Sequence, residues 1–126
     1  MTLKFYKCQH CGNVITKVVD HKVPVFCCGE KMTQLVPNTS DGAGEKHIPV
    51  VEVNGNLVKV TVSTVQHPSV AAHFIQFIAI ATTTGFQVKN LQAGETPEAT
   101  FVLNPDEKVV AAYEYCNLHG LWASEL

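Results

Sequence analysis

The chain has 126 residues, of which 46% are hydrophobic and 16% are charged. This length allows one compact domain with a small appended unit, and it excludes repeat arrays and large enzymes. Nine lysines and no arginine stand against eleven acidic residues, which gives a formal charge of -2. The sequence therefore lacks the broad basic surface that nucleic-acid binding requires.

The N-terminal residues contain neither an apolar core nor a small-residue cleavage motif, which predicts a cytoplasmic chain that is not exported. The most apolar stretch, 70–81, is shorter than the roughly 20 residues that a membrane span needs. We expect a buried strand there and no membrane association. In a reducing compartment, five cysteines beside six histidines indicate metal sites in preference to a disulfide scaffold.

Four of the five cysteines form two pairs near the N-terminus, Cys8-x2-Cys11 and, after fifteen residues, Cys27-Cys28. Together they predict one tetrathiolate site, for which zinc and iron are both suitable metals. Adjacent cysteines can share an ion only through a local turn, because an extended strand points neighbouring side chains apart. A redox-active CxxC motif or an adjacent-cysteine disulfide would explain one pair but not both.

Composition changes near residue 37, where turn-forming residues occupy 37–44. A unit as short as 1–36 buries too little apolar surface to fold alone and needs a staple such as a metal ion. We therefore predict a small metal-bound domain at 1–36 and a second domain at 37–126.

The second domain consists of short β-type runs separated by Gly, Pro and Asn. Val58, Val60 and Val62 alternate with polar residues, as in a strand with one solvated face, and Asn54-Gly55 predicts a tight hairpin turn. No segment has the period of a helix, so the even spacing favours an antiparallel β-sandwich. The expected strands are 48–53, 57–65, 73–81, 86–91, 99–103 and 109–115.

Histidines indicate a second metal site in this domain. Cys116-x2-His119 is a two-ligand clip, and three further histidines lie at strand edges or turns, namely His47, His67 and His73. The last two cannot share an ion along one regular helix or strand, but a loop that doubles back can bring them together. Four imidazoles and a thiolate favour a redox metal and leave one octahedral position open. Beside it, Lys46 would attract a small anion.

These motifs, in this order over nearly the whole chain, resemble desulfoferrodoxin, the two-iron superoxide reductase. The matching residues are Cys8-x2-Cys11, Cys27-Cys28, Glu45-Lys46-His47-x-Pro49, His67-Pro68, His73 and Cys116-Asn117-Leu118-His119-Gly120. The resemblance implies a mainly β protein with a desulforedoxin-like domain that holds iron on four cysteines, followed by an immunoglobulin-like β-sandwich. It also implies a homodimer, with rubredoxin as the usual electron donor.

The resemblance further implies a catalytic iron with four histidines in its plane and Cys116 opposite a vacant position. There Fe(II) would reduce superoxide to hydrogen peroxide with one electron and two protons, without release of dioxygen. Lys46 would steer superoxide and organise protonating waters, while Glu45 would occupy the vacant position in the resting ferric state. Without the metal, both are ordinary solvated charges.

This sequence departs from the family pattern at several positions around the site. Segment 68–72 lacks the expected Met and acidic residues, and Phe74 and Phe77 stand where Tyr and Trp are expected. The stretch 79–90 also diverges. These changes alter the surroundings and the partner contacts but not the proposed ligands. Trp122 fits the pattern either as a core anchor or as a group that tunes the iron.

Two other functions compete with this interpretation. A blue-copper electron carrier also combines a β-sandwich with an early histidine and a C-terminal clip, and it would use only His47, Cys116 and His119. No Met follows His119, however. A zinc module for protein contacts would explain the cysteines but leave the histidines idle. Within the reductase interpretation, the four-cysteine centre either relays electrons or chiefly staples the small domain and the dimer.

Overall fold

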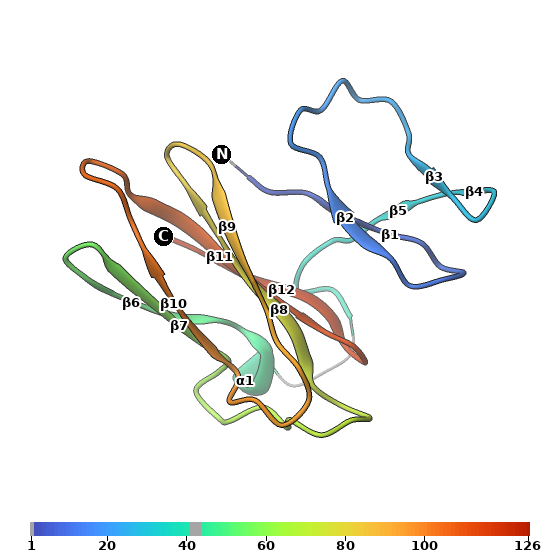
Figure 1. Ribbon diagram of the computed structural model, residues 1–126. Coiled ribbons are helices and arrows are strands. Elements are labelled where there is room, and N and C mark those ends of the chain that lie inside the picture. Colours follow the sequence, from blue (N-terminus) through green and yellow to red (C-terminus); the bar gives the residue numbers. More distant parts are fainter. Residues whose placement is uncertain (1, 41–43) are drawn as a thin grey trace. The chain divides into compact units, whose positions relative to one another are not determined.

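The computed structural model describes residues 2–40 and 44–126, except for the side chain of Glu45, and divides them into two compact units, Thr2–Val36 and Pro37–Leu126 (Figure 1). The expectation of a mainly β protein is confirmed. One short α-helix, α1 (Gly44–His47), accompanies the strands in the described ranges. No helix in these ranges has the length and hydrophobicity needed to cross a membrane.

The N-terminal unit contains two small antiparallel sheets. Strand β1 (Phe5–Lys7) lies between β2 (Val14–Thr16) and β5 (Thr33–Gln34), while β3 (Phe26–Cys27) pairs with β4 (Glu30–Lys31). The sequence did not predict these strands, because two or three residues are too few to show an alternating pattern. Their hydrophobic core is small and consists of Leu3, Phe5, Cys8 and Met32.

The second unit is a β-sandwich of a three-stranded sheet, in the order β10-β7-β6, and a four-stranded sheet, in the order β12-β11-β8-β9. Side chains from both sheets form one core, which includes Val58 and Phe101 from the first sheet and Ile78, Ile80 and Ala112 from the second. The strands are β6 (Val50–Asn54), β7 (Leu57–Thr61), β8 (Ile75–Thr82), β9 (Phe86–Asn90), β10 (Glu98–Val102), β11 (Val109–Cys116) and β12 (Gly120–Glu125).

All six predicted strands of this unit exist with shifted ends, and β12 was missed. In β12 two successive side chains, Leu121 and Trp122, are both buried, so its sequence does not alternate. Strand β7 ends at Thr61, earlier than expected. Ser63, which we expected on the solvated face, is buried and its hydroxyl donates to the Ile48 carbonyl at 2.6 Å.

Two turn regions differ in detail from the prediction. The β6–β7 hairpin is present, but its two-residue loop is Gly55-Asn56, one position later than expected, because Asn54 pairs with Leu57. Gly55 takes the positive φ of 62° that the turn needs. In the boundary segment, the Asn38 side chain exchanges hydrogen bonds with the Ala123 backbone at 3.2 and 2.9 Å, which attaches this residue to β12.

Glu107 ties two loops at the end of the sandwich. Its carboxylate accepts hydrogen bonds from the hydroxyls of Thr82 and Thr84 and from the backbone N–H of Asn104. These donors, with Thr82 first, hold the pKa of Glu107 below its ordinary value. The carboxylate therefore stabilises the fold above the unfolded-state pKa of about 4.3, and this contribution is lost as the pH falls through the lower folded-state pKa.

We therefore predict that Glu107→Gln lowers the free energy of unfolding at neutral pH and has little effect at low pH. Urea titrations of both proteins from pH 3 to pH 7 measure the difference. It should be largest above about pH 5 and should shrink below about pH 4, as the Glu107 carboxylate takes up a proton and both side chains become uncharged. A difference that does not change with pH would show that the charge of Glu107 has no role.

Candidate metal centres

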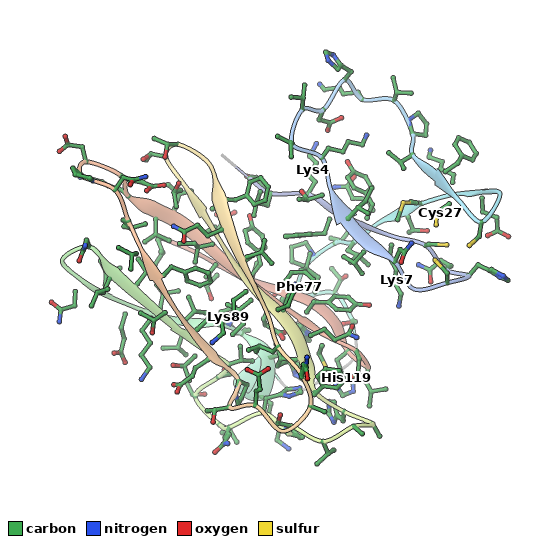
Figure 2. All side chains as sticks on the ribbon, viewed as in Figure 1. Lys4, Lys7, Cys27, Phe77, Lys89 and His119 are labelled. Atoms are coloured by element: carbon green, nitrogen blue, oxygen red, sulfur yellow. The ribbon has the colours of Figure 1, made fainter. Side chains whose placement is uncertain are left out.

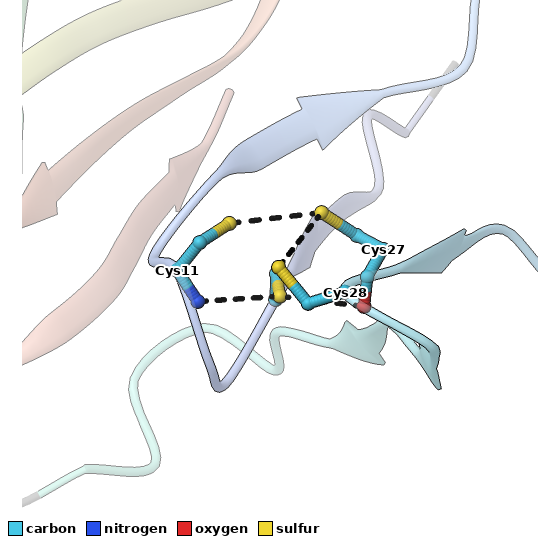
Figure 3. A group of neighbouring side chains, drawn as sticks. Cys11, Cys27 and Cys28 are labelled. Atoms are coloured by element: carbon cyan, nitrogen blue, oxygen red, sulfur yellow. Dashed lines mark hydrogen bonds between the residues drawn. The ribbon is translucent and has the colours of Figure 1, made fainter.

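The first candidate centre lies in the N-terminal unit and contains Cys8, Cys11, Cys27 and Cys28, whose sulfur atoms all lie within 4.8 Å of one another. The Sγ atoms of Cys11 and Cys27 are 3.6 Å apart, and those of Cys27 and Cys28 are 4.0 Å apart (Figure 3). A tetrahedral ion bound at about 2.3 Å holds its sulfurs about 3.8 Å apart. All four cysteines are free thiols, so the spacing fits a metal and not a disulfide.

Two backbone turns make this arrangement possible. After the first pair, the Gly12 N–H donates to the Cys8 carbonyl at 2.9 Å with a φ of 85°. Between β3 and β4, Cys28 and Gly29 form a two-residue loop with φ values of 54° and 75°, as a type I′ turn requires. This turn is how adjacent cysteines can direct both sulfurs to one point.

The thiols of this centre differ in acidity. The Cys11 backbone N–H donates to the Cys8 sulfur at 3.4 Å, and this bond is the main cause that lowers the pKa of Cys8 to about 6. Contact with the Cys11 thiol is the main cause that raises the pKa of Cys28 to about 12. Because thiolates crowded together repel one another, all four ionise together only around a cation. The cluster is therefore suited to a metal ion.

The second candidate centre lies in the sandwich unit, where four imidazole rings occupy the corners of a square. Neighbouring ring centres are 4.8 Å apart for His47 and His67, 4.6 Å for His67 and His73, 5.1 Å for His73 and His119, and 4.8 Å for His119 and His47. The diagonal between His47 and His73 is 6.5 Å, close to the side multiplied by the square root of two. Neighbouring rings are nearly perpendicular, at 75 to 89°.

These candidate ligands come from four parts of the chain. His47 ends α1, His67 and His73 lie on the loop between β7 and β8, Cys116 ends β11, and His119 lies in the turn before β12. The loop doubles back through a pair of backbone hydrogen bonds between Val70 and His73, at 3.0 and 2.9 Å. This is the geometry that brings the imidazoles of His67 and His73 to the same place.

The contacts between imidazole nitrogens fit a metal better than hydrogen bonds. His47 Nε2 lies 3.2 Å from His67 Nε2 and 3.1 Å from His119 Nδ1. An imidazole nitrogen has either one proton or one lone pair in its ring plane, so it cannot form two good hydrogen bonds at once. Two nitrogens bound at right angles to one ion at about 2.1 Å are about 3.0 Å apart, as found here.

Burial and hydrogen bonds prepare the donor atoms. His67 Nδ1 lies 2.7 Å from the Pro68 carbonyl, which fixes the proton there and leaves Nε2 a free lone pair. Burial lowers the pKa of His67 to about 4 and also lowers that of His73, so both rings are neutral at physiological pH. His73 Nε2 is buried and has no hydrogen-bond partner in the described part of the chain, as expected of an atom reserved for a metal.

The thiol of Cys116 completes this donor set. The residue is fully buried, and its sulfur lies with donor nitrogens of His47, His67 and His73 within 4.8 Å of one another, while His119 joins them through its contact with His47. Burial raises the pKa of Cys116, and the backbone N–H groups of His119 and Leu118 oppose this shift. A cation in the centre would therefore displace the thiol proton.

Of the two residues predicted to act on the substrate, the structure describes one fully. Lys46 is exposed on α1, and its charge adds to burial and His119 in lowering the pKa of His73. The side chain of Glu45 is outside the described residues. The catalytic roles of both remain predictions.

Two residues hold the ligand loops, and sequence reasoning missed the role of the first, Asn117. The Asn117 side-chain amide donates to the Ala72 carbonyl at 3.1 Å and accepts from the Phe74 N–H at 2.9 Å. These two hydrogen bonds fix the backbone on both sides of His73. The Trp122 Nε1–H donates to the His119 carbonyl at 3.0 Å, and its ring stacks on His47 at 4.9 Å. Trp122 is thus both a core anchor and a support for two ligands.

We predict that Asn117→Ala lowers the metal affinity of this centre by about 10- to 100-fold, as loss of a supporting hydrogen bond commonly does. Competition with a chelator measures the affinity while the four-cysteine centre serves as an internal reference. The matched control is Asn90→Ala, which removes an exposed amide at the end of β9 and should leave the affinity unchanged. Equal affinities in both variants would show that Asn117 does not position His73.

One buried acidic residue on β11 was also not foreseen. Glu114 is fully buried, and both of its oxygens lack hydrogen-bond partners among the described residues. Burial raises the pKa of Glu114 to about 9, so the carboxyl group is neutral at physiological pH. A protonated carboxyl avoids most of the cost of burying a charge.

Comparison with known proteins shows the family of this chain. The family model of desulfoferrodoxin matches residues 39–125, which include all five ligands of the second centre. The chain belongs to the desulfoferrodoxin family. A desulfoferrodoxin of Nitratidesulfovibrio vulgaris is 43% identical over 122 residues, which cover 97% of this chain and 95% of that protein.

Two solved structures show how far the likeness extends. The superoxide reductase of Treponema pallidum matches with a TM-score of 0.84 and 38% identity over 98% of each chain. A superoxide reductase of Giardia intestinalis, described as the one-iron type, matches with a TM-score of 0.56 and 34% identity over 65% of this chain and 99% of that one. About a third of this chain therefore lies outside the match with the Giardia intestinalis protein.

The geometry also decides against the competing functions. A blue-copper site would use three of the ligands, yet the structure brings all four imidazoles to one square with a thiol beside them. A zinc module for protein contacts gives no reason for that square. Two metal sites, one of four cysteines and one of histidines with a cysteine, account for all five cysteines and four of the six histidines.

Proposed function

We propose that this superoxide reductase holds one iron ion in its histidine and cysteine centre and there reduces superoxide to hydrogen peroxide without releasing dioxygen. The family and the fold shared with the Treponema pallidum enzyme make the chain an oxidoreductase of this type. The observation that carries the proposal is the square of four imidazoles beside the buried thiol of Cys116. Four nitrogens and one sulfur suit a redox metal.

The chemistry requires one electron and two protons for each superoxide. When bound, ferrous iron supplies the electron. The five donors would hold the iron and leave room for a small ligand, and the exposed ammonium group of Lys46 would attract the superoxide anion toward it. Lys46 would also hold water near the site, from which protons reach the product. Glu45 would take the place of the small ligand in the resting oxidised state.

The backbone around Cys116 stabilises the thiolate that the reaction needs. Two N–H groups, from Leu118 and His119, stabilise the thiolate, which donates electron density to the metal. Protons delivered on the solvent side favour release of intact hydrogen peroxide over cleavage of its O–O bond. The residues proposed for catalysis are therefore Lys46 and Glu45, and those proposed as ligands are His47, His67, His73, Cys116 and His119.

The proposal also covers the second metal ion, the electron donor and the oligomeric state. The four-cysteine centre, Cys8, Cys11, Cys27 and Cys28, holds a second iron ion in a desulforedoxin-like domain, and no organic cofactor takes part. A rubredoxin-type protein supplies the electrons, and the protein works as a cytoplasmic homodimer. The close packing of four free thiols in one small unit supports the second iron.

Metal analysis and rapid kinetics test the function. Protein purified without added metal should contain two iron ions per chain by mass spectrometry. The reduced protein, mixed with superoxide in a stopped-flow instrument, should form one hydrogen peroxide per superoxide and no dioxygen. Copper in the histidine centre, or zinc with no reaction, would overturn the proposal. Dioxygen in equal amount to peroxide would indicate dismutation instead.

A further inference from the structure

Charge is unevenly divided between the two units. Residues 2–36 carry five lysines against Asp20 and Glu30, a formal charge of +3, whereas residues 37–126 carry four lysines against nine acidic residues, a formal charge of -5. The net charge of the chain hides this contrast. A basic unit attached to an acidic one attracts acidic molecules to one part of the protein only.

Most of the positive charge of the N-terminal unit surrounds one cavity of about 510 Å³. Four of its five lysines line this cavity, and Tyr6, Val23, Pro24 and Met32 contribute apolar surface. Figure 2 shows Lys4 on this unit, which also carries Cys27. The lining lysines are Lys4, Lys17, Lys22 and Lys31.

The single carboxylate that lines the cavity is already paired. Lys17 Nζ lies 3.2 Å from the Asp20 carboxylate and 2.7 Å from the Val23 carbonyl, and the Asp20 carboxylate also accepts from the Lys22 N–H at 2.7 Å. The Lys22 N–H is the main cause that holds the pKa of Asp20 low, followed by Lys17. These bonds fix the loop that forms the rim of the cavity.

The other three lysines are exposed and form no ion pair. Within the described ranges, no carboxylate lies within ion-pair distance of Lys4, Lys22 or Lys31. Three unpaired ammonium groups around an open cavity repel one another. An acidic surface placed there would relieve that repulsion, and Val23, which is 65% exposed, would supply an apolar contact inside the charged rim.

Two strands that contribute to the cavity also lead toward the four-cysteine centre. Tyr6 lines the cavity from β1, and the same strand leads directly to Cys8. Lys31 lines it from β4, whose pairing with β3 places Glu30 opposite Cys27. A compact unit of 35 residues has a radius of gyration of about 8.5 Å. Because the unit is this small, a partner bound at the cavity lies a short distance from the four-cysteine centre. Cys11 and Cys28 are also exposed to solvent.

We propose that the lysine-lined cavity of the N-terminal unit is the docking site of an acidic one-electron carrier protein, whose carboxylates pair with Lys4, Lys22 and Lys31. The inference rests on the proposed function, because it names where the electron donor binds. In the docked complex, one electron passes from the reduced carrier to the ferric ion of the four-cysteine centre, and no bond forms or breaks. Such encounters between redox proteins are weak and bury little area.

The test compares two triple variants with the same change of net charge. The docking variant is Lys4→Gln with Lys22→Gln and Lys31→Gln. The control variant is Lys59→Gln with Lys89→Gln and Lys108→Gln, which changes three lysines of the other unit. Visible absorption of the four-cysteine iron checks that the N-terminal unit is folded in both. The probe is an acidic rubredoxin, used with iron for kinetics and with zinc for binding by calorimetry.

At about 10 mM ionic strength, where charges act over about 30 Å, the docking variant should accept electrons from reduced rubredoxin about 10-fold or more slowly than the unmodified protein. Zinc rubredoxin should bind it correspondingly weakly. The control variant should change both quantities less than about threefold. Salt at about 0.5 M should remove most of the difference between the variants.

Three outcomes would overturn the docking site. Equal losses in the two variants would show that only net charge matters, and unchanged binding in both would place the donor elsewhere. Micromolar binding of inorganic tripolyphosphate that only the docking variant loses, with rubredoxin binding unaffected, would assign the cavity to a small anion. Chemically reduced protein mixed with superoxide is the separate test of the proposed function, since it needs no carrier. Failure there with normal docking would overturn the function alone.

Discussion

Cys116→Ser should remove fast superoxide reduction while the four-cysteine centre stays intact. The Cys116 sulfur is fully buried beside the imidazole square, and two backbone N–H groups stabilise its thiolate form. A serine hydroxyl keeps its proton and is a poor ligand for a redox metal that the thiolate suits. We expect loss of iron from this centre, or a reaction with superoxide slowed more than about 100-fold where iron is retained, since even supporting residues cost 10- to 100-fold.

Iron content and stopped-flow mixing with superoxide measure both effects, and the visible absorption of the four-cysteine centre reports on the other unit. The matched control is Leu118→Ala, because Leu118 lies in the same turn but is 60% exposed. It should leave iron content and rate unchanged. If Cys116→Ser keeps its iron and reacts as fast as the unmodified protein, the sulfur is not a ligand and the proposed centre is wrong.

The ligands were predictable because their residue types are rare and their spacing is informative. Four cysteines in two pairs admit few interpretations other than one metal site, and the structure places their sulfurs within 4.8 Å of one another. For the histidines, the sequence allowed a loop that doubles back, and the Val70–His73 bridge forms this turn in the structure. The square itself depends on strands that are distant in sequence, so no local pattern contains it.

Residues that support the ligands were not predictable from local patterns. Asn117 contacts Ala72 and Phe74, which lie 45 and 43 positions away in the sequence. Strands β1 to β5 have only two or three residues each, too few to show hydrophobic alternation. Composition therefore predicted a small unit that needs a metal but did not predict its sheets. Glu114 occupies a buried position in β11 where alternation favours an apolar residue.

Cys11→Ser tests whether the four-cysteine centre takes part in the reaction with superoxide itself. The N-terminal unit buries only a few apolar side chains, so its fold depends on the metal that joins the first cysteine pair to Cys27 and Cys28. Loss of one thiolate should release the metal and expose this unit to rapid hydrogen exchange and proteolysis. The sandwich keeps its own core and all five ligands of its centre, so it should stay folded.

Superoxide reduction by the chemically reduced Cys11→Ser variant should therefore stay within about twofold of the unmodified rate, since the reacting centre lies wholly in the sandwich unit. Hydrogen exchange measured by mass spectrometry locates the destabilised segment, and metal analysis verifies that the histidine centre is full. His10→Ala is the matched control, because this exposed side chain lies between the same two cysteines and is not a ligand. A slow reaction with superoxide despite a full histidine centre would mean that the four-cysteine iron takes part in that reaction, beyond stabilising its unit and accepting electrons from a carrier.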